Sequence, residues 1–180
     1  MTSTALVALA EIGDKTQLLS FALAAKLQRP FPIMIGIFAA TLLNHALAAW
    51  FGTVAASLVT PEFLKWIVGL SFIACGLWAL KADTLDVEPR IFSAGIFVTT
   101  LLAFFLAEMG DKTQFATIAL AARYDAPMLV ILGTTLGMLL ANAPAVWIGK
   151  VLAERIDMKI LDSIGWIAPS DRKWTAGSGR

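Results

Sequence analysis

The chain has 180 residues, of which 58% are hydrophobic and 15% charged, and its formal net charge is +1. The hydrophobic share is above that of soluble domains, in which about half of the residues are apolar. The mean hydropathy is +0.77. The small net charge gives no reason to expect nucleic-acid binding. The single cysteine, Cys75, excludes an intrachain disulfide and a thiolate metal cluster.

Five apolar segments are long enough to cross a bilayer as helices, which takes about 20 residues each. They are expected at residues 4–27, 31–58, 63–80, 92–122 and 128–151. The first lacks the basic N-terminal region of a signal peptide and is expected to be a retained helix. The fourth is long enough to be tilted or broken. The sequence therefore predicts an all-α polytopic membrane protein.

A seven-residue motif occurs twice in these segments. Residues 11–17 read Glu-Ile-Gly-Asp-Lys-Thr-Gln, and residues 108–114 repeat them with Met109 in place of Ile12. An ionised carboxylate within a transmembrane helix costs about 3 kcal/mol or more, and such residues usually face a partner or a water-filled cavity. The four acidic residues are therefore expected to face one another or an aqueous pathway.

The repetition extends beyond the motifs. At the same offset of 97 residues, Gly36 aligns with Gly133 and Gly52 with Gly149, without a gap. This pattern indicates a duplicated three-helix unit. Because three is odd, the second unit is expected to enter the membrane from the opposite side, as in transporters with inverted repeats. The expected organisation is a first repeat at 1–80, a linker at 81–90, a second repeat at 91–159 and an atypical polar tail at 160–180, in which the sixth helix is missing or degenerate.

The lysine and arginine residues of the short loops predict the orientation, because they gather on the cytoplasmic side. Seven of them flank the loops after the first, third and fifth helices: Lys26, Arg29, Lys81, Arg90, Lys150, Arg155 and Lys159. Only Lys65 and Arg123 lie near the opposite loops. The N-terminus is therefore expected outside, and the central linker in the cytoplasm.

The acidic residues of the motifs are predicted to form a cation site. On a helix, Glu and Asp three positions apart share one face, and the glycine between them permits close backbone approach or local unwinding. If the two copies meet, their oxygens suit manganese or calcium. The expected metal ligands are Glu11, Asp14, Glu108, Asp111, Gln17 and Gln114, with Lys15, Lys112, Thr16, Thr113, Ser20 and Thr117 as auxiliary residues.

Carboxylates also bind protons, so the same groups hold either a divalent cation or protons, which is the minimal chemistry of a cation/proton antiporter. Lys15 and Lys112 oppose metal binding, and are expected to pair with a carboxylate when the metal leaves or to extend toward the membrane interface. A purely structural role as internal ion pairs is the alternative for both motifs. His45 is expected to form a packing hydrogen bond, with a proton-relay or ligand role as the alternative.

The doubled Glu-x-Gly-Asp-Lys-Thr, followed by Gln both times, resembles the membrane family that includes bacterial manganese exporters and Golgi and chloroplast-envelope manganese/calcium transporters. This family is related to cation/calcium exchangers, and the resemblance covers residues 4–157. It implies six helices in two inverted repeats, and a cation site made by the four acidic residues of the motifs. It also implies manganese export across a bacterial inner membrane in exchange for protons. The chain departs from the family at its C-terminal end, where the family has an apolar sixth helix.

The leading hypothesis is a secondary transporter that exports manganese by proton antiport, with calcium as an open second substrate. No cofactor and no catalytic residue are expected. The expected partners are divalent cations, protons and the lipid bilayer, without nucleic acid, and a homodimer is left open. The rival hypotheses are an exporter of amino acids or other small solutes, a metal-dependent membrane enzyme and a non-transporting assembly subunit.

Overall fold

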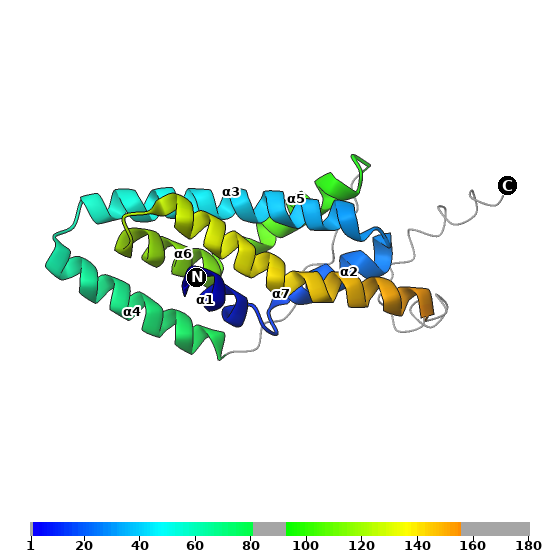
Figure 1. Cartoon of the computed structure of the whole chain (residues 1–180), viewed down its shortest axis with the longest axis horizontal. Helices are drawn as coiled ribbons and strands as arrows, with labels where there is room; N and C mark the ends of the chain where they lie inside the picture. The colour runs from blue at the N-terminus through cyan, green and yellow to red at the C-terminus, as the bar shows by residue number, and fades with distance from the viewer. Residues whose placement is uncertain (1, 81–92, 156–180) are drawn as a thin grey trace.

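The computed structural model describes residues 2–80 and 93–155, and every element in these two ranges is a helix (Figure 1). The helices are α1 (Thr2–Ala10), α2 (Lys15–Leu27), α3 (Pro30–Ser57), α4 (Pro61–Ala79), α5 (Ile96–Glu108), α6 (Lys112–Arg123) and α7 (Pro127–Arg155). The all-α prediction is confirmed for these residues. The predicted linker at 81–90 and the polar tail at 160–180, with its missing sixth helix, lie outside the described residues.

Three of the described helices, α3, α4 and α7, are long and apolar enough to cross a membrane by length and composition. They correspond to the predicted segments 31–58, 63–80 and 128–151. Each begins with a proline: Pro30, Pro61 and Pro127. Proline suits the first position of a helix, because its missing N–H would have no partner within the helix there.

The other two predicted segments are each broken into two helices. The prediction of one continuous helix over residues 4–27 was wrong, because a turn separates α1 from α2. The fourth segment was expected to be tilted or broken, and the structure shows a break between α5 and α6. Gly13 and Gly110 lie in these breaks with φ of +79° and +78°. A helix cannot continue through this left-handed conformation, which glycine adopts at little cost.

The two halves of the chain pack against each other reciprocally. α3 packs on α5 and α6, while α7 packs on α1 and α2. The helices α3 and α7 also contact each other and run antiparallel. Ile33 and Ile37, early in α3, share a core with Val146, late in α7, whereas Ala49, late in α3, clusters with Val130, early in α7. Both breaks lie near the middle of the long axis (Figure 1).

Repeated glycines make equivalent close contacts in the two halves. An added Cβ at Gly52 of α3 would lie 2.3 Å from the carbonyl oxygen of Ile118 in α6. An added Cβ at Gly149 of α7 would lie 2.6 Å from the carbonyl oxygen of Phe21 in α2. Both glycines and both partners are related by the offset of 97 residues. Small residues permit such close helix packing in membranes.

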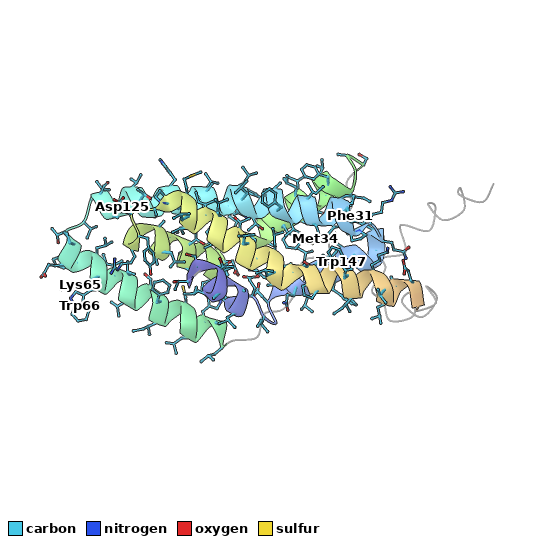
Figure 2. The ribbon with its side chains drawn as sticks, in the orientation of Figure 1. Phe31, Met34, Lys65, Trp66, Asp125 and Trp147 are labelled. Carbon is cyan, nitrogen blue, oxygen red and sulfur yellow. The ribbon has the colours of Figure 1, made fainter. Side chains whose placement is uncertain are left out.

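The surface carries many large apolar and aromatic side chains. Figure 2 shows Phe31 of α3 beside Trp147 of α7 at one end of the molecule, where their rings form a T-shaped pair with centroids 6.4 Å apart. Lys65 and Trp66 of α4 lie toward the opposite end, as does Asp125. Most of α4 is exposed, as expected of a helix that faces lipid.

Candidate functional site

Each break is built by a glycine followed by an aspartate. An added Cβ at Gly13 would meet nothing within 4 Å, so glycine is needed there for its backbone conformation alone. Asp14 then caps α2, because its Oδ2 accepts a hydrogen bond from the Thr16 amide at 3.4 Å. Asp111 caps α6 through the Thr113 amide at the same distance. Such caps satisfy an amide of the first helical turn, and the repeated motif therefore gives the same break twice.

The glutamine of each motif closes the turn. Gln17 Oε1 accepts from the Gly13 amide at 2.9 Å, and Gln114 Oε1 accepts from the Gly110 amide at 2.8 Å. Gln17 Nε2 also donates to the carbonyl of Ala141 in α7 at 2.9 Å. The two amide oxygens were predicted to bind a cation, but here they bond to the backbone and hold the shape of the breaks.

Glu11 and Glu108 each place a carboxylate in the interior, with 0% and 1% of the residue exposed. Glu11 Oε2 accepts from Thr16 Oγ1 at 2.5 Å, and Glu108 Oε2 accepts from Thr113 Oγ1 at 3.1 Å. The other oxygen of each glutamate, Oε1, is buried without a hydrogen-bond partner among the described residues. Because a buried polar atom without a partner is costly, these two oxygens are the candidates to bind a cation or a proton.

Two ion pairs connect the breaks. Lys112 Nζ pairs with Asp14 Oδ1, and Lys15 Nζ pairs with Asp111 Oδ1 at 2.7 Å. Each lysine therefore neutralises the aspartate of the other motif, which is one of the two arrangements predicted for the lysines. The Lys112 side chain is 5% exposed, whereas that of Lys15 is 26% exposed.

Carboxylates from both motifs meet at one point. Glu11, Asp14 and Glu108 are buried, and each offers an oxygen within 4.8 Å of the others. Asp111, the fourth predicted ligand, is not in this group, but Lys15 pairs with it. A site made of oxygens suits hard divalent cations such as calcium and manganese, whereas zinc and copper(I) favour nitrogen or sulfur.

The predicted auxiliary hydroxyls have different partners. Thr16 and Thr113 donate to the two glutamates. Ser20 Oγ donates to Asn142 Oδ1 of α7 at 2.7 Å, and Thr117 Oγ1 donates to the Thr113 carbonyl at 2.8 Å. The structure therefore places Ser20 in a contact between helices, and Thr117 in a bond to its own helix, which is common for a threonine in an apolar helix.

Other buried polar groups lie on α3 and α7. His45 is 1% exposed, and neither of its ring nitrogens has a partner among the described residues, so the expected packing hydrogen bond is not found there. Asn44 Nδ2 donates to the carbonyl of Phe105 in α5 at 3.1 Å. The hydroxyls of Thr41 and Thr135 are also buried without a partner among these residues. Neither threonine was predicted as a site residue, because nothing in the sequence distinguishes them from threonines that bond to their own helix.

Comparisons with known proteins identify the family of this chain. The chain is 54% identical over 159 residues to a Vibrio cholerae serotype O1 protein named "Putative manganese exporter", which covers 88% of this chain and 80% of that protein. It is 28% identical over 198 residues to GDT1-like protein 5 of Arabidopsis thaliana, which covers 88% of this chain and 86% of the relative. No solved structure matches the chain. A family model described as "Divalent cation/proton antiporter GDT1" matches residues 1–86 and 96–168, both motifs included. The chain therefore belongs to the GDT1 family of divalent cation/proton antiporters.

Proposed function

We propose that this chain exports manganese(II) across the bacterial inner membrane in exchange for protons, with calcium as a second candidate substrate. One observation carries the proposal: buried carboxylates of both motifs meet within 4.8 Å, and Glu11 and Glu108 each keep one oxygen without a partner among the described residues. The family consists of transporters, so the chain is not an enzyme, and the cation is a substrate rather than a cofactor.

The exchange follows from the chemistry of carboxylates. A divalent cation needs the glutamates ionised, whereas a proton on a glutamate removes the charge that holds the cation. The two substrates therefore compete for the same oxygens, and a site that opens to one side at a time exchanges one for the other. The printed name of the Vibrio cholerae relative supports manganese as the cation.

The proposed architecture is a pair of inverted repeats at residues 1–80 and 91–159, joined by a cytoplasmic linker at 81–90, with the N-terminus outside. The equivalent glycine contacts of α3 on α6 and of α7 on α2 support the repeats, as does the antiparallel course of α3 and α7. Both breaks then lie near the membrane midplane, where such transporters bind their substrates.

Cellular manganese content tests this function. An exporter-deficient bacterium grown in excess manganese is given either the original chain or the Glu108→Gln variant, and the membrane content of both proteins is measured. We expect lower cellular manganese with the original chain only. Equal manganese with both proteins, at equal amounts in the membrane, contradicts the proposal. If the chain instead exported zwitterions such as amino acids, added manganese would not change its transport activity.

A further inference from the structure

The aspartates of the two motifs have both carboxylate oxygens in use. Asp14 Oδ2 accepts from Thr16, and its Oδ1 pairs with Lys112. Asp111 Oδ2 accepts from Thr113 in the same way, and its Oδ1 pairs with a lysine of the first motif. For an aspartate to bind a cation through Oδ1, the cation must displace a lysine and leave its charge in a largely apolar environment, which is costly.

The glutamates differ from the aspartates in this respect. Glu11 and Glu108 each use Oε2 to accept from a threonine, and each leaves Oε1 buried and without a hydrogen-bond partner among the described residues. The same division between glutamate and aspartate occurs in both motifs. It is therefore a property of the motif rather than of one location in the structure.

The charges divide in the same way. Lys112 pairs with Asp14 and Lys15 pairs with Asp111. Within residues 2–80 and 93–155, the two acidic residues of the motifs without an ion pair to a lysine are therefore the glutamates. Glu11 and Glu108 come from opposite motifs and lie in one buried group, which also includes the lysine-paired Asp14. The two carboxylates together match the charge of a single divalent cation.

We infer that Glu11 and Glu108 alone bind the transported divalent cation, whereas Asp14 and Asp111 are positioning residues that remain paired with the lysines. Each aspartate caps one helix and holds the lysine of the other motif, and thereby fixes the two breaks relative to each other. This inference rests on the proposed function, and it assigns the four acidic residues to two separate roles.

Charge-matched double variants test the division. The Asp14→Asn/Lys112→Gln variant and the Glu11→Gln/Lys112→Gln variant each lose one carboxylate and one lysine, so their net charges are equal. Asparagine also retains the helix cap. Binding of Mn²⁺ to the purified protein is measured by the loss of the free Mn²⁺ electron paramagnetic resonance signal. We expect the aspartate–lysine variant to bind within about threefold of the original chain, and the glutamate–lysine variant to bind at least about tenfold more weakly.

The single variants provide a second readout, because a structural defect alone would not shift affinity in both directions. Asp14→Asn leaves the Lys112 charge without Asp14 and is expected to weaken Mn²⁺ binding, whereas Lys112→Gln is expected to strengthen it. The Asp111/Lys15 pair supplies the same set of variants if the first set does not fold. The exposed Glu62–Lys65 pair of α4, at 3.3 Å, is the matched control.

Two outcomes overturn the inference. If the two double variants lose affinity equally, or the aspartate–lysine variant loses more, the aspartates are ligands and only the division of roles fails. If the original chain does not bind Mn²⁺, the proposed function fails and the inference fails with it. The affinity of the original chain therefore distinguishes the two failures.

Discussion

The two motifs have nearly identical internal contacts but different surroundings. In both, the aspartate caps a helix, the threonine donates to the glutamate and the glutamine accepts from the glycine amide. The second motif lies beneath α4, which packs on α6, and the first has no such helix over it among the described residues. The contacts within each break therefore follow the motif, whereas the cover over it differs with the neighbouring helix.

The lysines show this difference most clearly. Lys112 is almost fully buried, while about a quarter of the Lys15 side chain is exposed. Cys75 of α4 donates a long hydrogen bond from Sγ to the Lys112 carbonyl, at 3.7 Å. A cavity of about 170 Å³ remains between α1, α4 and α6, lined by residues that include Phe72, Cys75 and Lys112. The two sides of the site are thus unequal although the motifs are alike.

The largest expected effect tests whether the motifs are equivalent in function. Glu11→Gln and Glu108→Gln should each reduce manganese transport about a hundredfold, because removal of one charge from a buried ionic site costs about 3 kcal/mol. Uptake of manganese into inverted membrane vesicles measures this. Glu62→Gln, on the exposed surface of α4, is the control and should transport normally. A large loss from one glutamate only would show that the motifs are not equivalent.

The next effect concerns the packing of the two halves. Gly52→Ala and Gly149→Ala should lower stability by about 1–3 kcal/mol, because each new methyl group would meet a carbonyl oxygen of the facing helix. The loss should be larger at Gly52, where the approach is closer. Thermal unfolding in detergent, followed by circular dichroism, measures both changes. Gly69→Ala, with open space around it on α4, should not destabilise the protein; a similar loss there would contradict the explanation.

A smaller effect is expected at the breaks themselves. Gly13→Ala and Gly110→Ala should each cost about 1–2 kcal/mol, because alanine is strained at a positive φ. The two losses should be equal, since an added Cβ meets nothing within 4 Å at either site. Gly13→Asn should cost less, because asparagine tolerates this conformation better. Unequal melting temperatures for the two alanine variants would show that surroundings, and not only the motif, determine the breaks.

The smallest effect concerns the cover provided by α4. Cys75→Ala should change stability by less than about 0.5 kcal/mol, because a thiol is a weak donor and its bond to the Lys112 carbonyl is long. The same detergent melting curves measure it. A loss comparable with that of Gly52→Ala would mean that α4 holds the second motif in place rather than only shielding it.

Much of the fold follows from patterns along the chain. Apolar length and the prolines predict α3, α4 and α7, and the doubled motif predicts where charge is buried. The first segment was predicted as one helix, with local unwinding at its glycine as an option, because a single glycine is compatible with a continuous helix. In the structure Asp14 and Gln17 stabilise the break through the backbone of the turn.

The partners of the site residues are harder to predict. Lys15 follows Asp14 in the sequence but pairs with Asp111, and only the opposed packing of the two broken helices brings these residues together. The glutamine oxygens were predicted as cation ligands from their chemistry. In the structure each accepts a hydrogen bond from the amide of the glycine four residues earlier. Sequence patterns identify which groups are buried, whereas the folded backbone decides which of their atoms remain free.

The reciprocal ion pairs join the two breaks in a closed ring of four residues. Peptide bonds join Asp14 to Lys15 and Asp111 to Lys112, and ion pairs join Lys15 to Asp111 and Lys112 to Asp14. A displacement that separates the breaks strains both ionic links together, so neither link opens gradually while the other stays intact. Linked contacts of this kind favour two discrete arrangements over a continuum of intermediate ones. We therefore expect the two breaks to change their relative position together, in one step.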